Sequence, residues 1–394
     1  MAAEAAVTAQ PQDDGPFQTE RVATISGAHA VHDTYTSFLP PLLPLFIETL
    51  SLTITPAGFL TVFMQAPSLL QPMIGHLADR VSLRYFVILA PGVTATAMSL
   101  LGIAPSYAVL AVLLVVAGLS SASLHSVAPV MSGRLSGKNL GRGMGFWMVG
   151  GEVGRTLGPL VIVAAIQYLG AARTPWLMVG GWLATVILYV RLRDVPGRPT
   201  QAVDGLPWRE ALRAMGPFLV PLVGIVTVRS FMITALTTYL PVLLTEQGAS
   251  LWFAGISLSV LEVAGVAGAL LGGSLSDRLG RRWILLVSLA ATPVVMLVFL
   301  ATSGWMQFPL LLCLGFTALS MTPVIMALVQ ESFPRNPALA NGVYMSLSFV
   351  IRSGAIIVVG LMADLWDMRI AFAVSAAIPL LGLPFLLLLP PRRR

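Results

Sequence analysis

The sequence predicts an all-α integral membrane protein with twelve transmembrane helices in two pseudo-symmetric six-helix bundles. Of the 394 residues, 56% are apolar before glycine is counted, only 10% are charged, and the apolar residues form long continuous stretches. A soluble protein of this size would have too few polar residues to cover its surface. At roughly 20 residues per span, the chain accommodates about twelve helices. Because the stretches are continuous rather than alternating, an outer-membrane barrel is excluded.

Twelve apolar segments, each long enough to cross a membrane, follow one another along the chain. Prolines at 40, 41 and 44 in the first segment, and Pro241 in the seventh, predict kinks in these two helices. The predicted spans are residues 22–48, 56–78, 85–104, 106–131, 142–168, 175–190, 217–244, 252–275, 283–302, 305–330, 338–362 and 369–389.

The distribution of basic residues predicts the orientation of these spans. An even number of spans places both termini on one side, and most of the 23 basic residues fall in loops on that side. Only Arg173 and Arg369 fall in loops on the opposite side. By the positive-inside rule both termini are cytoplasmic, so we expect a multi-pass protein of a bacterial-type inner (plasma) membrane. The net charge of +6 therefore reports orientation, and we expect no nucleic-acid partner.

A charged, proline-containing loop divides the chain into two halves. The first residues are polar and acidic and do not resemble a cleaved signal peptide, which indicates a disordered cytoplasmic tail. Cys313 is the only cysteine, so no intramolecular disulfide can form. The expected organisation is a tail at 1–21, a six-helix bundle at 22–190, a cytoplasmic linker at 191–216, a second six-helix bundle at 217–389 and a basic tail at 390–394.

The motif G-x-L-x-D-R-x-x-x-R occurs once in each half, at residues 75–84 and 273–282. Two halves of the same orientation imply parallel repeats, with a site between them near the membrane midplane. Glycine lets helices approach closely, and the aspartate can face the positive N-terminus of another helix. The expected gating residues are Gly75, Asp79, Arg80, Arg84, Gly273, Asp277, Arg278 and Arg282.

Two helix starts are the expected partners of these aspartates. Asn336 and Pro337 form an N-cap and first-residue signal for the eleventh helix, which Asp79 is expected to meet. Asp277 is expected to meet the start of the fifth helix near Asn139. These contacts would stabilise the outward-facing state.

The repeated motif, the mid-chain loop and the six-plus-six arrangement make nearly the whole chain resemble the major facilitator superfamily. The fifth helix adds Gly154-Arg155-Thr156-Leu157-Gly158-Pro159, which looks like the G-x-x-x-G-P element of the antiporter branch. This resemblance implies the major facilitator fold, no resident cofactor, and secondary active transport by alternating access.

A narrower resemblance is to the fosmidomycin-resistance-like exporters. Residues 29–33, His-Ala-Val-His-Asp, match a first-helix pattern of His, three residues, then Asp. Residues 69–75 are similar to that branch's second helix, and residues 120–125, which end in a histidine after small residues, match its fourth. The departures bear on the substrate rather than the fold; they are His32, Ser126, Val127, Glu152 and Arg155.

Six ionisable residues, three acidic and three basic, lie well inside the predicted spans. A charged residue at a helix centre costs roughly 2.5–3.5 kcal/mol on insertion scales, so these side chains must face the bundle interior and pair. Glu152 and Arg155 are three residues apart and can pair along one helix face, which favours helix packing as their role. The six are Asp33, Glu152, Glu262, Arg155, Arg229 and Arg352.

Three histidines accompany Asp33 as candidates for the site: His29, His32 and His125. His29 and Asp33 share a helix face, as metal ligands would, but no cysteine supports a metal site and the resemblance implies none. We therefore expect no metal, and a divalent-metal permease is a weaker alternative. His125 fits either a structural histidine or a proton relay.

The sequence thus predicts a secondary active transporter rather than an enzyme, because no catalytic motif is present. The leading function is proton-coupled efflux of a drug or metabolite by a monomer in the lipid bilayer. The alternative is uptake or uniport of an organic anion, which Arg155, Arg229 and Arg352 could hold. Asp33 is the expected proton-coupling carboxylate. Arg229 and His125 are expected beside it in a cavity lined by the first, fourth, seventh and tenth helices.

Overall fold

The computed structural model describes residues 16–71, 73–74, 84–137, 140–195, 208–333 and 337–388. Within these ranges every secondary-structure element is a helix, short turns and irregular segments join the helices, and no strand is present. The all-α fold class is therefore confirmed.

The N-terminal half consists of six membrane crossings, several of which are built from two consecutive helical pieces. The first crossing is α1 followed by α2, and the second is α3 followed by η1. The elements are α1 (Thr19–Thr36), α2 (Leu39–Thr49), α3 (Ile54–Gln65), η1 (Ala66–Leu70), α5 (Arg84–Ser99), η2 (Leu100–Ile103), α6 (Tyr107–Leu135), α7 (Leu140–Leu169), η3 (Ala171–Leu177) and α8 (Met178–Leu192).

The C-terminal half repeats this arrangement with six further crossings. Its seventh crossing is interrupted like the first, and its tenth and twelfth are also built from shorter pieces. The elements are α9 (Trp208–Thr234), η4 (Ala235–Tyr239), α10 (Leu240–Glu246), α11 (Leu251–Leu279), α12 (Arg281–Leu300), η5 (Gly304–Met306), α13 (Gln307–Leu319), α14 (Met321–Ser332), α15 (Pro337–Leu365), α16 (Met368–Ala377), η6 (Ile378–Gly382) and α17 (Leu383–Leu388).

The described helices confirm the predicted number of spans. Ten of them are long and apolar enough to cross a membrane, and Ile54–Leu70 is a shorter apolar helix. The interrupted first crossing, α1 with α2, completes the twelve. Proline explains the two interruptions, because Pro40, Pro41 and Pro241 cannot donate the backbone hydrogen bonds that would continue the helix.

Two expected boundaries need correction, and a third cannot be placed. The first helix begins at Thr19, inside the expected tail, and α9 begins at Trp208, inside the expected linker. The expected end of the last span, residue 389, lies just outside the described residues. The charged residues Arg209, Glu210 and Arg213 are compatible with a helix, but they lower the hydropathy. Hydropathy therefore located the span within α9 and not the start of the helix.

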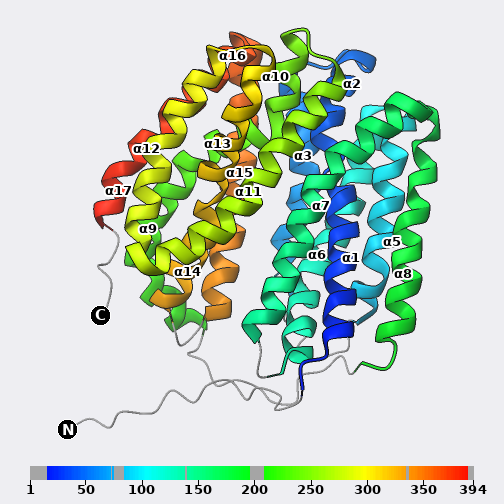
Figure 1. Ribbon diagram of the computed structural model, residues 1–394, viewed down its shortest axis with the longest axis vertical. Helices are drawn as coiled ribbons and strands as arrows, with labels where there is room; N and C mark the ends of the chain where they lie inside the picture. Colours follow the sequence, from blue (N-terminus) through cyan, green and yellow to red (C-terminus); the bar gives the residue numbers. More distant parts are fainter. Residues whose placement is uncertain are drawn as a thin grey trace.

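The two halves meet near the end of the molecule that carries α2 and α10, and their ribbons diverge towards the end where α6 and α14 terminate (Figure 1). The contacts between halves join α11 to α7, α15 to α3, and α10 to α2. One of them is the edge-on contact of Tyr168 and Trp252, whose ring centroids lie 6.2 Å apart. We call the joined end the closed end.

Candidate transport site

Three glycines hold α7 directly against α1. Gly150, Gly154 and Gly158 recur every four residues, and each faces the backbone of α1 so closely that a Cβ atom would collide with a carbonyl oxygen. The facing residues on α1 also recur every four residues; they are Ser26, Ala30 and Thr34. Small residues at this spacing let two membrane helices approach each other closely. The G-x-x-x-G-P element therefore has a physical role, which is to bring α7 up to Asp33.

Asp33 is buried where α1, α6 and α7 come together. Its Oδ2 atom lies 3.3 Å from Nε2 of His29, and its Oδ1 atom lies 3.7 Å from Nε2 of His125. Nη1 of Arg155 lies 3.7 Å from Oδ2. The side chains of His29 and Asp33 are only 5% and 6% exposed, whereas that of His125 is 32% exposed. We call these four residues the Asp33 cluster.

Backbone carbonyl groups fix the orientation of both imidazoles. Nδ1 of His29 lies 2.9 Å from the carbonyl oxygen of Trp147, whose indole ring also stacks on the imidazole at 3.6 Å between centroids. Nδ1 of His125 lies 2.9 Å from the carbonyl oxygen of Ser121. The two Nε2 atoms face each other at 3.2 Å. The cluster thus contains a carboxylate and two convergent imidazole nitrogens.

Arg155 connects this cluster to two further carboxylates. It contacts Glu152 on its own helix, so the expected pair along one helix face does form. Its Nε atom lies 3.8 Å from Oε2 of Glu262 on α11, which belongs to the other half of the molecule. The Arg155 side chain is 41% exposed although it lies within an apolar span. One guanidinium group therefore joins three acidic residues, of which Asp33 and Glu262 are buried, across the interface between the halves.

Arg229 does not lie beside Asp33, contrary to expectation. Its Nη2 atom donates to the hydroxyl of Thr322 at 2.6 Å and to the carbonyl oxygen of Ala318 at 3.3 Å, so it packs against α13 and α14 within its own half. In the described part of the chain, no carboxylate lies within ion-pair distance of it. Asp33 and Arg229 were expected together because they occupy nearly equivalent positions in the two halves. The arginine that lies next to Asp33 is instead Arg155.

Arg352 and His32 complete the predicted set. Arg352 donates to the hydroxyl of Thr237 at 2.9 Å and interacts electrostatically with Glu262. His32 is fully buried, and its ring lies 5.7 Å from that of His125, between centroids. Neither ring nitrogen of His32 makes a hydrogen bond of good geometry within the described residues, and the carbonyl of Ala90 is the neighbouring acceptor.

Only part of the predicted gating motif can be placed. Gly75, Asp79 and Arg80 lie outside the described residues, as do Asn139 and Asn336. Of the rest, Arg84 contacts the carbonyl oxygen of Arg193 and lies over the ring of Tyr85. The second copy falls on the end of α11, which contains Gly273, Asp277 and Arg278, and on the first turn of α12, which contains Arg282. The eleventh helix, α15, does begin at Pro337 as expected.

A contact that the sequence did not predict joins the halves at the closed end. The carboxylate of Asp364, near the end of α15, accepts hydrogen bonds from the backbone N–H groups of Ile54 at 2.6 Å and Thr55 at 2.9 Å. Thr53, the N-cap residue of α3, makes no capping bond with its own side chain. A residue of one half thus caps a helix of the other. The only sequence signal is an acidic residue at the end of a span.

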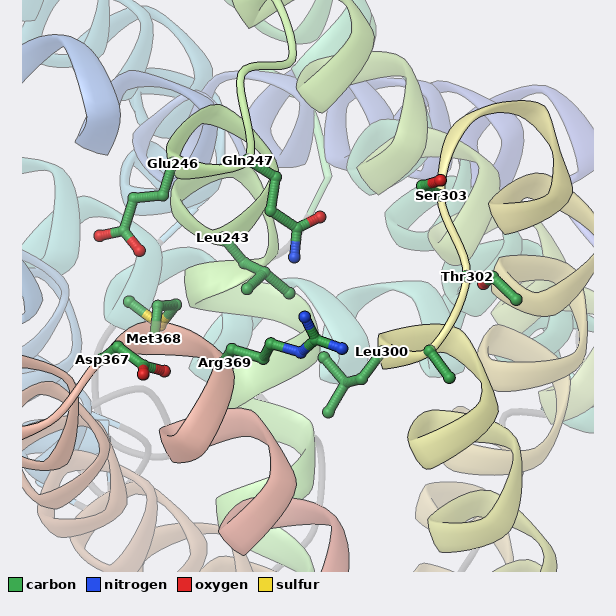
Figure 2. A pocket seen from close by; sticks show the side chains of 10 residues that line it. Leu243, Glu246, Gln247, Leu300, Thr302, Ser303, Asp367, Met368 and Arg369 are labelled. Carbon is green, nitrogen blue, oxygen red and sulfur yellow. The ribbon is translucent and has the colours of Figure 1, made fainter.

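Two hollows also lie at the closed end, away from the Asp33 cluster. The larger has a volume of about 540 Å³ and is formed by α10, α12 and α16. Figure 2 shows the side chain of Arg369 in its centre, with Glu246 and Asp367 on one side and Thr302 on the other. The smaller, of about 370 Å³, lies between α2 and α10. Neither is lined by a residue of the cluster.

The donor atoms of His29, Asp33 and His125 lie within 4.8 Å of one another, close enough to test as a metal site. Nη1 of Arg155 lies beside the same carboxylate oxygen that faces His29. A guanidinium group is always charged and has no lone pair to offer a metal, so it would repel a divalent cation at this position. We therefore assign no metal ligands here.

The comparison with known proteins agrees with this architecture. The profile of the Major Facilitator Superfamily matches residues 25–356 and 263–394. The chain belongs to the Major Facilitator Superfamily. It is a multi-pass membrane transporter and not an enzyme, and the resemblance stated from the sequence is confirmed.

Two relatives align over most of the chain. The fosmidomycin resistance protein of Escherichia coli (strain K12) is 25% identical over 373 residues, which cover 92% of this chain and 91% of the relative. The uncharacterized MFS-type transporter YfnC of Bacillus subtilis (strain 168) is 23% identical over 91% of this chain and 90% of its own length.

Solved structures of transporters share the fold. A bacterial homologue of the human lysosomal transporter Spinster, in an inward-facing and occupied conformation, superposes with a TM-score of 0.81 at 16% identity and covers 95% of this chain and 97% of its own. A D-xylose–proton symporter gives a TM-score of 0.72 at 16% identity, over 94% of this chain and 97% of its own. At these identities the likeness concerns the fold alone.

Proposed function

We propose that this member of the superfamily is a proton-coupled antiporter that exports a small organic solute, a drug or metabolite, across the inner membrane by alternating access. The observation that carries the proposal is the buried carboxylate of Asp33, held between two histidines and Arg155. Ionisable residues in the interior of a membrane bundle mark proton and substrate pathways. The similarity to a fosmidomycin resistance protein favours efflux.

Asp33 is the proposed coupling carboxylate because the other two acids are less suited. Glu152 is in direct contact with Arg155 on its own helix, an arrangement that serves helix packing. Glu262 belongs to α11, in the other half, and lies next to Arg155 and Arg352. Asp33 is instead flanked by two imidazoles as well as by Arg155, and its negative charge would balance a proton held on the imidazoles.

The first experiment identifies a ligand. The purified protein is screened by thermal shift against a panel of small organic compounds that includes fosmidomycin. A ligand that binds only the folded state raises the melting temperature. The stabilising compound is then assayed in proteoliposomes with an imposed pH gradient. Accumulation that follows the gradient supports the proposal, and accumulation that is independent of pH contradicts it.

Transport of an organic anion is the second candidate, and the guanidinium groups of the C-terminal half favour it. Arg229 and Arg352 outnumber Glu262 there, and the Nε atoms of both arginines lack a hydrogen-bond partner in the described residues. A carboxylate or phosphate would satisfy them. If Arg229→Gln loses the stabilisation by anionic compounds but keeps that by neutral ones, an anion is the substrate.

We also propose that both termini face the cytoplasm and that the protein functions as a monomer. The loop charges support the orientation. Accessibility of a C-terminal tag in intact cells tests it, because a tag that is labelled from outside contradicts the assignment. The mass of the purified protein in detergent tests the monomer.

A further inference from the structure

The two imidazoles of the Asp33 cluster cannot both be neutral without a conflict. A carbonyl oxygen only accepts hydrogen bonds, so Nδ1 of His29, facing Trp147, and Nδ1 of His125, facing Ser121, each carry a hydrogen. The hydroxyl of Ser121 is farther from His125 Nδ1, at 3.3 Å. In a neutral imidazole only one nitrogen carries a hydrogen, which leaves a lone pair on each Nε2 atom.

These two lone pairs face each other at 3.2 Å, next to the Asp33 carboxylate. Three acceptors with no hydrogen among them repel one another, and His29 and Asp33 are too buried for solvent to relieve this readily. A single proton resolves the conflict. On Nε2 of His29 it would be donated to Nε2 of His125 and Oδ2 of Asp33, at distances suited to a shared hydrogen bond.

We propose that the coupling proton is stored between Nε2 of His29 and Nε2 of His125, while Asp33 stays ionised as its counter-anion. This assignment rests on the proposed proton-coupled transport and names the groups that bind the proton. The proton is taken from water by one imidazole nitrogen, and it is returned to water when the cluster is rearranged. No other reactant is required.

The surrounding charges match one proton rather than a divalent cation. Within the N-terminal half, the carboxylates of Asp33 and Glu152 face one guanidinium group, Arg155, so one proton makes this part of the site neutral. A divalent cation would leave an excess of positive charge. Three charged groups of the other half lie on this side of the Asp33 cluster. Glu262 lies 3.8 Å from Arg155, and Arg352 interacts with Glu262. Arg229 lies farther away, against α14.

His125 is the point at which the proton would enter. Its side chain is 32% exposed, against 5% for His29 and 6% for Asp33. His32 packs edge-on against His125, but its position on α1 does not bring its nitrogens into the facing pair. His32 is therefore a matched control, because it is a buried histidine on α1, the helix that carries His29.

The experiment places the proton spectroscopically in the full-length protein in nanodiscs. The chain has four histidines, so ¹⁵N-histidine labelling gives few imidazole signals to assign. In His29→Asn and His125→Asn, the side-chain amide of asparagine keeps an N–H group near the position of Nδ1. The substitution removes Nε2. We expect an imidazolium signal that is lost in both variants and kept in His32→Asn. We also expect at least a tenfold loss of pH-driven transport in both.

Infrared spectroscopy gives a second readout that does not depend on whether the histidine variants fold. A protonated-carboxyl band that is missing in Asp33→Asn would overturn the assignment, because the proton would then be on Asp33. Binding of Zn²⁺ that is lost in His29→Asn and His125→Asn would also overturn it, in favour of a metal. Absence of pH-driven transport by the wild-type protein would instead contradict the proposed function, whatever the spectra show.

Discussion

Nη1 of Arg155 lies 3.7 Å from Oδ2 of Asp33, and the two residues belong to helices that glycines hold in backbone contact. Packing and charge thus depend on each other at this site. Without the close approach of α7 to α1, Arg155 would not reach Asp33. Without Arg155, the acidic residues around it would be buried with fewer partners.

Adding a side chain to the glycine seam, by which we mean Gly150, Gly154 and Gly158, should destabilise the protein. A Cβ atom on Gly154 would lie 2.8 Å from Cβ of Asp33 and 2.9 Å from the backbone nitrogen of Thr34. We expect Gly154→Ala to cost roughly 1–3 kcal/mol and to lower the melting temperature. Gly145→Ala is the control on the same helix, because a Cβ there meets nothing within 4 Å. Equal melting temperatures for the two variants would contradict the role of the seam.

Removing the guanidinium group of Arg155 should also destabilise the protein. Loss of one partner from a buried ion pair costs about 3–5 kcal/mol, and the partial exposure of Arg155 reduces this to roughly 1–3 kcal/mol. We expect Arg155→Gln to melt at a lower temperature than the wild type. Arg173→Gln, a change at an exposed residue of η3, should have no such effect. A melting temperature of Arg155→Gln equal to that of the control would show that the network contributes nothing.

The Asp364 contact should hold the closed end together. Asp364→Ala removes the two hydrogen bonds that the carboxylate accepts from the start of α3. A loss of about 1.4 kcal/mol changes the ratio of the closed to the open conformation of this end tenfold. Spin labels at Glu48→Cys and Gln247→Cys, in a Cys313→Ser background, report the separation of α2 and α10. In Asp364→Ala we expect a larger population with a long distance between the two labels than in the wild type.

Asp367→Ala is the matched control for this experiment. Asp367 also caps a helix, accepting from the N–H of Ile370 at 2.6 Å, but both residues belong to the same half. Its loss should leave the distance distribution unchanged. If the two variants behave alike, the contact between the halves does not control opening.

The gating role of the repeated motif remains a prediction from the sequence. If Asp79 stabilises the outward-facing state at the start of α15, Asp79→Asn should shift the population inward. Cysteine accessibility on the two faces of the membrane measures this shift. Unchanged accessibility in Asp79→Asn would mean that the motif has another role.

Much of the fold could be predicted because continuous hydropathy directly reflects the thickness of the membrane. All twelve spans were found in this way, and proline located the interruptions in α1–α2 and α9–α10. The helix start at Trp208 was missed, because hydropathy measures immersion in the membrane and not helix formation.

The site was harder to predict, because its members meet only through tertiary packing. The Glu152–Arg155 pair is local and was found from spacing alone. The approach of His29 to His125, and of Asp33 to Arg155, depends on how α1, α6 and α7 pack. Repeat symmetry suggested Arg229 instead, but symmetry gives depth in the membrane and not the direction in which a side chain points.

The most direct test of the central claim, that Asp33 couples transport to protons, compares three proteins in proteoliposomes: wild type, Asp33→Asn, and Asp33→Asn with Arg155→Gln. Accumulation of the ligand found in the thermal-shift panel is measured under an imposed pH gradient, together with exchange in its absence. We predict that Asp33→Asn keeps exchange and loses gradient-driven accumulation, and that the double variant does not recover it. Recovery in the double variant would contradict the account, because Asp33 would then be only the structural partner of Arg155.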